Sequence, residues 1–502
     1  MVHDLKYNTL FAVCLAPTFS TKAAAGLQEF RYWEFPVNQP AAYNDEEVTM
    51  SAREGSLEAP TRHPLDWQNP EFYDEKACFD EMERIFDICH GCRRCVSLCG
   101  SFPTLFDLVD EGSTGEVDGV DKKDYWKVVD QCYLCDVCYL TKCPYVPPHP
   151  WNLDFPHTML RAKAIQFKKG TPTKFRDVTL SNTAANGKLA SIPVVVQTVN
   201  ALSKNKTARS IGEKVIGVHK DAWVPEFTTK VFEKTATKSA SLPVKNGDRS
   251  KGKVAIYSTC YVNWNEPSIG HDLIKVLKHN EIPYVVVEKQ ACCGMPKLEL
   301  GDLDSVADLA RQNLPRLAAL AREGYAIVTP IPSCTLMFKQ EIPLMFPNDP
   351  DAQAVKAAMF DPFEYFQLRH KDGLLKTDFK EGLGNVSYHI ACHLRVQNVG
   401  QKTRETLEMI PDTAVNTVER CSGHAGTWGV KKEFHEMAMK IGRPVFRQMA
   451  EHPKANNGQG GDPDYVASDC QLAGHHIEQG MAGKADGKVA HPLSLLAQAY
   501  GL

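Results

Sequence analysis

The sequence predicts an α+β multidomain fold, in which a helical domain with two cysteine-rich runs precedes an α/β unit that occurs twice. Three observations support this prediction. Eight cysteines lie between residues 89 and 143 in two closely spaced runs. From residue 253 onward, apolar segments of strand length alternate with segments of helical periodicity. Further cysteines follow the strand-like segments at a nearly constant offset, which indicates an internal duplication.

Length and composition limit the classes of protein that the chain can represent. The 502 residues predict about three domains. Hydrophobic residues make up 43% of the chain and charged residues 24%, which is ordinary for a soluble globular protein. The net charge of -4 is too small to indicate a nucleic-acid partner. No apolar run approaches the roughly 20 residues that a transmembrane helix needs.

Residues 1–70 are expected to form an extended N-terminal segment, because they mix proline, glycine and acidic residues without periodicity. Residues 10–16 form a short apolar patch that resembles a weak signal-peptide core. We interpret the patch instead as part of a tail, or as sequence upstream of an alternative start at Met50. Cys14 and Cys78 lie outside every motif, and we expect them to be ordinary free cysteines.

The two cysteine runs have the spacing expected for iron–sulfur clusters. The first run is C-x2-C-x2-C-x3-C and the second is C-x2-C-x2-C-x4-C-P. A C-x2-C-x2-C loop supplies three thiolates to one cluster, and in two-cluster ferredoxins the fourth comes from the other run. The pattern predicts one [4Fe-4S] cluster on Cys89, Cys92, Cys95 and Cys143. It predicts a second [4Fe-4S] cluster on Cys132, Cys135, Cys138 and Cys99.

Zinc binding and buried free thiols are two other interpretations of these cysteines. A zinc site of four thiolates would leave four of the eight cysteines without a role. A set of buried free thiols would not explain the spacing. The cluster domain is expected to span residues 71–170, with helices over Glu75–Asp87, Pro103–Val109 and Asp124–Val129. Because iron needs reduced thiolates, the protein is expected in a reducing compartment.

A connector is expected over residues 171–252. It is rich in turn-forming residues and lysine, and its segment Val194–Val218 has the spacing of one or two amphipathic helices. The preceding segment Arg161–Lys169 is basic and has helical spacing. The polar segment Pro243–Lys253 is expected to be a linker and marks a domain boundary.

The duplicated unit is expected over residues 253–380 and again over 381–502. The first copy has predicted strands at Val254–Ser258, Tyr284–Glu288 and Ala326–Pro330, and the second at Val386–Ile390, Ala414–Val418 and Tyr465–Ala467. Cysteines follow these strands at Cys260, Cys292, Cys293 and Cys334 in the first copy, and at Cys392, Cys421 and Cys470 in the second. Parallel strands carry their ligand sites at their carboxyl ends, so each copy is expected to gather its cysteines at one sheet edge. Gly294 supplies the tight turn that the vicinal pair requires.

The motifs DICHGCRRC, CDVCYLTKCPY, ACCGMP and RCSGHAGTWG resemble those of the heterodisulfide reductase-related family. This family includes the iron–sulfur subunits of anaerobic glycerol-3-phosphate dehydrogenase, glycolate oxidase and lactate-utilisation complexes. The resemblance implies an α-helical dicluster ferredoxin domain, like that of succinate dehydrogenase iron–sulfur subunits, followed by a duplicated α/β CCG (cysteine-rich) domain. It also implies a metal site, either an iron–sulfur cluster or zinc, on Cys260, Cys292, Cys293 and Cys334.

The second copy departs from the family pattern because Ser422 stands where the vicinal cysteine is expected. Cys392, Cys421 and Cys470 remain. The fourth ligand could then be Ser422, an exogenous group, or one of the nearby histidines His393, His424, His475 and His476. An incomplete set leaves an open coordination position for chemistry. The alternative is a copy that packs without binding metal.

No dinucleotide-binding G-x-G-x-x-G, P-loop or G-x-S-x-G motif occurs, so a flavin is expected on another chain. The sequence therefore predicts a cytoplasmic iron–sulfur electron-transfer subunit, working between a partner flavoprotein dehydrogenase or small redox protein and a quinone or other acceptor. The protein could also be peripheral on the inner face of the cell membrane, held there through its partner. Two alternative functions are a heterodisulfide reductase-like enzyme that reduces a disulfide or small substrate at the CCG metal site, and a zinc-stabilised scaffold.

Overall fold

The computed structural model of the chain describes residues 59–170, 175–452, 461–482 and 487–502. The apolar patch at residues 10–16, Cys14 and Met50 lie outside these ranges. All the described residues belong to one compact unit. Among the described helices, none combines the length and the apolar character that crossing a bilayer requires.

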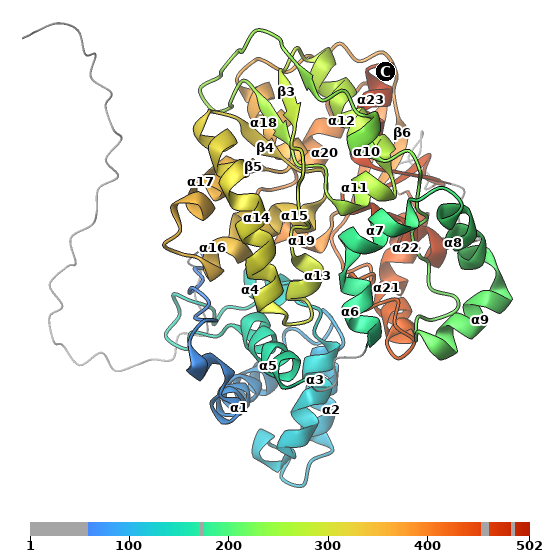
Figure 1. Ribbon diagram of the computed structural model, residues 1–502. Coiled ribbons are helices and arrows are strands. Elements are labelled where there is room, and N and C mark those ends of the chain that lie inside the picture. Colours follow the sequence, from blue (N-terminus) through green and yellow to red (C-terminus); the bar gives the residue numbers. More distant parts are fainter. Residues whose placement is uncertain (1–58, 171–174, 453–460, 483–486) are drawn as a thin grey trace, which may run out of the picture. The chain divides into compact units, whose positions relative to one another are not determined.

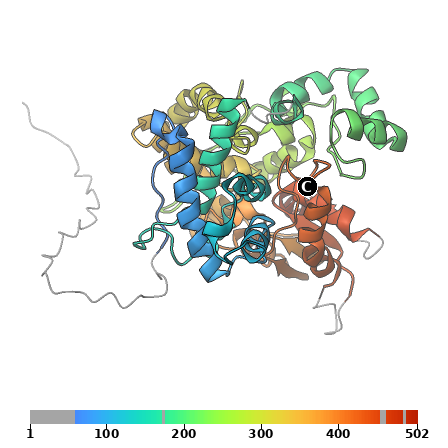
Figure 2. The same cartoon turned by 90° about the horizontal axis from the view of Figure 1, so that it is seen from below.

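A group of helices carries the two cysteine runs (Figure 1). These helices are α1 (Glu75–Cys92), α2 (Ser101–Asp110), α3 (Tyr125–Gln131), α4 (Val137–Thr141) and α5 (Phe155–Lys169), with short 3-10 turns at Pro70–Tyr73, Val117–Gly119 and Lys122–Asp124. Helix α1 starts at Asp74, whose side chain caps the Ala77 N–H, and it buries Met82, Ile85 and Phe86 on one face. It packs beside α5, as Figure 2 shows. The three helices predicted here are confirmed, and α1 continues through Cys92.

The described part of the connector, residues 175–252, forms five helices. They are α6 (Phe175–Ser181), α7 (Thr183–Ala190), α8 (Val195–Lys204), α9 (Lys206–Val215) and α10 (Phe232–Thr235). Helices α8 and α9 confirm the amphipathic helices expected within Val194–Val218, whereas α6 and α7 were not predicted. Helix α7 packs on α11, at the start of the first repeat.

The first repeat is a five-stranded sheet with the strand order β1-β3-β2-β4-β5. Its strands are β1 (Ser239–Ala240), β2 (Val254–Ile256), β3 (Tyr284–Val286), β4 (Ala326–Val328) and β5 (Met359–Phe360). All pairs are parallel except that between β1 and β3, and Val254 aligns with Tyr284 and Ala326. Its helices are α11 (Cys260–Trp264), α12 (Pro267–His279), α13 (Met295–Leu298), α14 (Leu303–Arg322), α15 (Pro332–Leu336), α16 (Ile342–Met345), α17 (Pro350–Ala358) and α18 (Pro362–Lys371), with a π-helical segment at Met337–Glu341.

The second repeat is a four-stranded parallel sheet with the order β7-β6-β8-β9. Its strands are β6 (Gly384–His389), β7 (Thr413–Val418), β8 (Tyr465–Ser468) and β9 (Lys488–Ala490). Its helices are α19 (Cys392–Arg395), α20 (Lys402–Leu407), α21 (His435–Ala450), α22 (Gln471–Met481) and α23 (Pro492–Ala499). Val386 aligns with Val415 and Tyr465, which matches the register around Val254 in the first repeat.

The predicted duplication is confirmed by the two sheets. Apart from the antiparallel edge strand β1, both have the same strand order, with the first strand of the repeat between the second and the third. The six predicted strands are present. Each copy also has a fourth parallel strand, β5 or β9, that was not predicted. These strands span only two or three residues, too few to show an alternation of apolar and polar residues.

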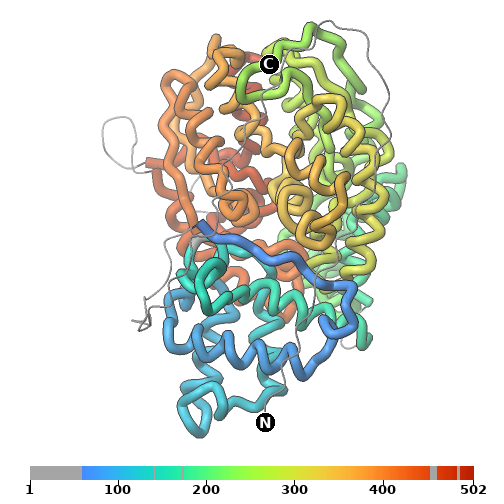
Figure 3. The backbone as a smooth tube through the Cα atoms, turned by 90° about the vertical axis from the view of Figure 1, so that its left-hand side faces the viewer, coloured from blue at the N-terminus to red at the C-terminus, as the bar shows by residue number. Residues whose placement is uncertain are grey.

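Residues 59–69 form an extended segment that runs along both the cysteine-bearing helices and the first repeat (Figure 3). The Thr61 N–H donates to the Pro147 carbonyl at 3.0 Å, and the Leu65 N–H donates to the Leu344 carbonyl at 2.9 Å. The indole N–H of Trp67 donates to the Met345 carbonyl at 3.0 Å. The extended character predicted for the N-terminal segment therefore holds over these residues.

Candidate metal centres

The first set of predicted cluster ligands lines one cavity. Cys89, Cys92, Cys95 and Cys143 meet there, with apolar walls that include Phe102 and Phe106. Helix α1 carries Cys89 and Cys92 and ends at Arg93, whose φ of 49° reverses the chain toward Cys95. Burial and the neighbouring thiols raise the pKa of Cys89 well above its usual value.

The second set of predicted ligands lines an adjoining cavity. Cys99, Cys132, Cys135 and Cys138 meet there, against Phe102 and Phe155. Phe102 forms part of both cavity walls. Burial raises the pKa of Cys138 well above its usual value, and the charge of Cys95 adds to this shift. Burial raises the pKa of Cys99 to about 12. Each C-x2-C-x2-C loop thus lies with the fourth cysteine of the other run, in the pairing that the sequence predicts.

The thiols that line these cavities suit an iron–sulfur cluster, because soft thiolates bind iron. In a [4Fe-4S] cluster each thiolate binds a different iron, so the four sulfurs stand apart around a central space. A structural zinc ion instead draws its thiolates to within about 2.3 Å of one point. The described cysteines are free thiols, which leaves every sulfur of both sets available.

The four cysteines of the first repeat meet at the carboxyl edge of its sheet. Cys260 begins α11 beyond β2, Cys292 and Cys293 follow β3, and Cys334 lies in α15 beyond β4. Side-chain hydrogen bonds link Cys260 to Cys292, Cys292 to Cys293, and Cys293 to Cys334. Gly294 has a φ of 98°, which confirms the tight turn predicted after the vicinal pair.

Within this set, Cys292 is the thiol that ionises most readily. Hydrogen bonds from Cys260 and Cys293 lower its pKa well below the usual value, with help from the Gly294 N–H at 3.5 Å. The pKa of Cys260 and that of Cys293 rise, because their protons are shared with Cys292 and because both are buried. A metal that binds such a set displaces these protons, so the donor chemistry suits a cationic centre.

The three cysteines of the second repeat line a cavity of about 90 Å³ at the equivalent sheet edge. Cys392 begins α19, Cys421 follows β7 and Cys470 precedes α22. The Cys392 and Cys421 thiols hydrogen-bond to each other. Ser422 is buried, lines the same cavity, and its hydroxyl accepts from the His424 N–H at 3.4 Å.

Two of the four candidate histidines, His393 and His424, line this cavity. His475 instead faces Glu266, with 2.6 Å between its Nε2 and a carboxylate oxygen. His476 does not line this cavity; it packs against the ring of Phe446. Burial lowers the pKa of His424 to about 4, so the imidazole is neutral and retains a free electron pair at physiological pH.

Several further side chains in this cavity were not assigned to it from the sequence; one is His389, at the end of β6, and three others come from other parts of the chain. Tyr133 and Cys135 belong to the second cysteine run, and Glu299 follows α13 of the first repeat. The Tyr133 hydroxyl lies 3.1 Å from the Cys421 sulfur, across 288 positions of sequence. Burial raises the pKa of Glu299 to about 7, although Lys163 and Lys431 oppose the shift.

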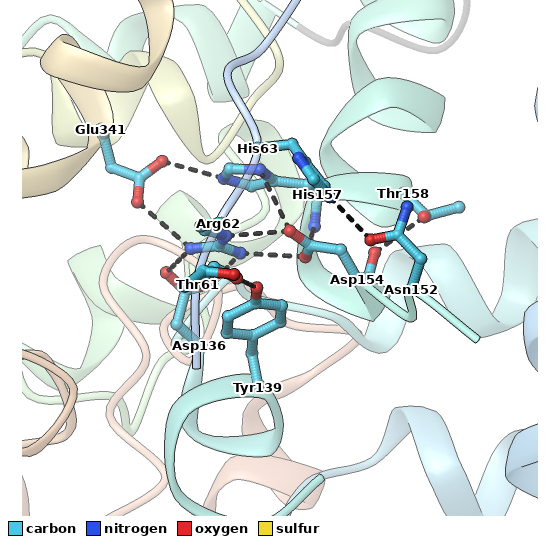
Figure 4. A network of polar contacts seen from close by, with 10 residues as sticks. All are labelled: Thr61, Arg62, His63, Asp136, Tyr139, Asn152, Asp154, His157, Thr158 and Glu341. Atoms are coloured by element: carbon cyan, nitrogen blue, oxygen red, sulfur yellow. Dashed lines mark hydrogen bonds and ion pairs between the residues drawn. The ribbon is translucent and has the colours of Figure 1, made fainter. Parts of the chain in front are cut away.

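A buried ion-pair network lies beside the second cysteine run (Figure 4). Arg62, 6% exposed, donates to Asp136 at 2.7 Å, to Asp154 at 2.9 Å and to Glu341 at 3.5 Å. His157 contacts the Glu341 carboxylate at 3.2 Å. Arg62 thus joins the extended segment, the cysteine-bearing helices and the first repeat. Its partner Asp136 directly follows Cys135 and has a left-handed φ of 59°.

The duplicated α/β unit and its cysteines define the class of the protein. The model of the cysteine-rich CCG domain matches residues 254–339 and 386–477, which are the two repeats. The chain therefore carries two copies of the cysteine-rich CCG domain, and it is similar to iron–sulfur proteins of the heterodisulfide reductase-related family.

Three named relatives are similar to parts of the chain. A subunit of anaerobic glycerol-3-phosphate dehydrogenase from Escherichia coli (strain K12) is 26% identical over 336 residues, which cover 66% of this chain and 78% of that protein. A subunit of fumarate reductase (CoM/CoB) from Methanothermobacter marburgensis is 29% identical over 261 residues, which cover 51% of this chain and 48% of the relative. Lactate utilization protein A from Bacillus pumilus is 26% identical over 227 residues, or 43% of this chain and 87% of the relative.

Proposed function

We propose that the protein is the iron–sulfur electron-transfer subunit of an oxidoreductase complex. It relays electrons between a partner flavoprotein or small redox protein and a quinone or other acceptor. The observation that supports this role is the succession of thiol-lined sites. Phe102 lines both cavities of the cysteine runs, and Cys135 lines both the second of these cavities and the cavity of the second CCG repeat. Such adjacency gives electrons short steps from one site to the next.

In this proposal the two cysteine runs hold two [4Fe-4S] clusters, in the pairing given above. The CCG repeats hold a further iron–sulfur cluster or zinc, with Cys260, Cys292, Cys293 and Cys334 as the complete set. When bound, an iron–sulfur cluster accepts and releases single electrons. The protein's part is to hold the thiolates, to exclude water with residues such as Phe102 and Phe155, and to set the local charge.

The proposed domains separate the two-cluster part of the chain from the two CCG repeats. They are the N-terminal segment 1–70, the dicluster ferredoxin domain 71–170, the connector 171–252, and the two CCG repeats 253–380 and 381–502. The connector offers a surface for the partner, because α8, α9 and their flanks expose large apolar side chains, among them Val194, Leu202, Ile211 and Val215. We place the protein in the cytoplasm, held at the inner face of the cell membrane through that partner.

A second candidate function is reduction of a disulfide or other small substrate at the second CCG site. The observation that favours it is the set of proton-bearing groups in the cavity, where Tyr133 and Glu299 accompany three cysteines. With its pKa near 7, Glu299 can release a proton at physiological pH. The discriminating assay mixes dithionite-reduced protein with a disulfide in the absence of any partner. Turnover supports this second function, and its absence supports the relay.

The relay proposal is tested by anaerobic iron, sulfide and zinc analysis combined with EPR. Two cubane clusters predict about eight iron atoms per chain, before any contribution from the CCG repeats. Cys92→Ser should lose the signal of one cluster, because its thiol lines the first cavity. Cys78→Ala is the matched control, since Cys78 is buried but lines neither of the two cluster cavities. Colourless, iron-free wild-type protein would rule out the relay.

A further inference from the structure

Cys135 lies on the boundary between two sites. It lines the cavity of Cys99, Cys132 and Cys138, and it also lines the cavity of the second CCG repeat. A side-chain hydrogen bond joins its thiol to Cys392. The packing of α4 against α19 brings these two cysteines together, although they lie far apart in sequence.

The backbone around Cys135 is held in an unusual conformation. Leu134 has a φ of 51° and Asp136 a φ of 59°, so residues in the left-handed region flank the cysteine on both sides. Neither residue is a glycine, and such strain persists where the surroundings impose it. Arg62 holds the Asp136 side chain in place by donating to both of its carboxylate oxygens, at 2.7 and 3.2 Å (Figure 4).

The second CCG repeat has one cysteine fewer than the first, and Cys135 enters the cavity that its three cysteines line. Its own set is Cys392, Cys421 and Cys470, with Ser422 at the vicinal position. The first repeat supplies four thiols from within itself. The second cavity therefore reaches the same number of thiols by accepting one from the cluster domain.

We propose that Cys135 is a shared ligand, whose thiolate completes the second CCG site while it also serves the second ferredoxin-type cluster. This inference rests on the proposed iron–sulfur function and names a contact through which electrons pass between the two sites. With metals bound, Cys135 would have given up its thiol proton to solvent, and its thiolate would help to hold the group in each cavity. No change of oxidation state accompanies this step.

EPR spectra of three single variants in the full chain test the proposal. Cys138→Ser should alter the signal of the second ferredoxin-type cluster alone, because Cys138 does not line the CCG cavity. Cys421→Ser should alter the CCG signal alone. Cys135→Ser should alter both. A Cys135→Ser spectrum that matches that of Cys138→Ser would overturn the shared ligand, while the relay itself would stand as long as wild-type protein contains clusters.

A rescue experiment separates the two roles of Cys135. Ser422→Cys restores the vicinal cysteine of the second repeat. Added to Cys135→Ser, it should recover the CCG signal and leave the ferredoxin-type signal lost. Recovery of neither signal, or of both, would overturn the proposal.

Metal-free wild-type protein provides a test that does not depend on how the variants fold. Ferricyanide, as a one-electron oxidant, should convert Cys135 and Cys392 into a disulfide, with two electrons passing to two ferricyanide ions and two protons to solvent. Peptide mass spectrometry would identify the bond. A disulfide from Cys135 to Cys132 or Cys138 instead would count against the proposal.

Discussion

Replacing Arg62 by methionine removes the cation that three buried carboxyl groups share, and the structure sets the size of the effect. Burial alone would raise the pKa of Asp154, but the charges and hydrogen bonds of Arg62 and His157 together outweigh burial and lower this pKa from 3.8 to about 2. That difference corresponds to about 2.5 kcal/mol of stability at neutral pH. Since Asp136 and Glu341 also lose their partner, we expect a total loss of about 3–5 kcal/mol, typical of a broken buried ion pair.

Urea unfolding of the anaerobically prepared chain, followed by circular dichroism, measures this loss. With a slope of about 3 kcal/mol per molar urea, the midpoint should fall by about 1–1.5 M. Arg311→Met is the control, because Arg311 pairs with Asp308 at an exposed position and should change stability by about 0.5 kcal/mol or less. Equal midpoints for the two variants would refute the reasoning.

The pH dependence gives an independent check on the same network. The folded-state pKa of Asp154 is depressed, so its stabilisation is complete above pH 3.8 and is lost as the pH falls toward about 2. The stability difference between wild type and Arg62→Met should therefore shrink across this interval. A difference that stays constant down to pH 2 would mean that the charge of Arg62 does not stabilise the fold.

Three other variants probe the second CCG site. In a thermal melt, Gly423→Ala should destabilise the second repeat by about 2 kcal/mol or more, because Gly423 has a φ of 81° and an added Cβ would collide with a carbonyl of α21. The control is Gly91→Ala, which should be neutral in the same melt because its added Cβ meets no atom within 4 Å. Tyr133→Phe removes the hydroxyl beside the Cys421 sulfur, so a redox titration should find a lower reduction potential at this centre. Trp428→Ala should cost about 3–5 kcal/mol in urea, since its buried indole donates to a carbonyl of α3 at 2.9 Å; an unchanged midpoint would contradict this packing.

Much of the fold is predictable because the signals are local. Helix α14 (Leu303–Arg322) shows such a signal, since its apolar residues recur at helical spacing after the capping residue Asp302. The central strands of both sheets are short apolar runs that end shortly before a cysteine. The edge strands β5 and β9 escaped prediction, because pairing with a neighbouring strand defines them rather than their own pattern.

The candidate sites divide in the same way. The thiols of each ferredoxin-type set and of the first CCG repeat meet as their spacing predicts. The surroundings of the second CCG site depend on contacts between distant segments, and nothing near Cys421 in sequence points to Tyr133 or Cys135. Proximity in sequence can also mislead. His475 lies close in sequence to Cys470 and was therefore a candidate ligand, but α22 directs its side chain toward Glu266.

The extended segment at residues 59–69 affects the order in which the parts of the protein can fold. Its hydrogen bonds end on Pro147, on one side, and on Leu344 and Met345, on the other. Although it leaves the ribosome early, it has no complete binding surface until both of these regions have formed. We therefore expect this segment to dock last during folding. Proteolytic cleavage of the segment in the folded protein would remove the connection that the two regions share.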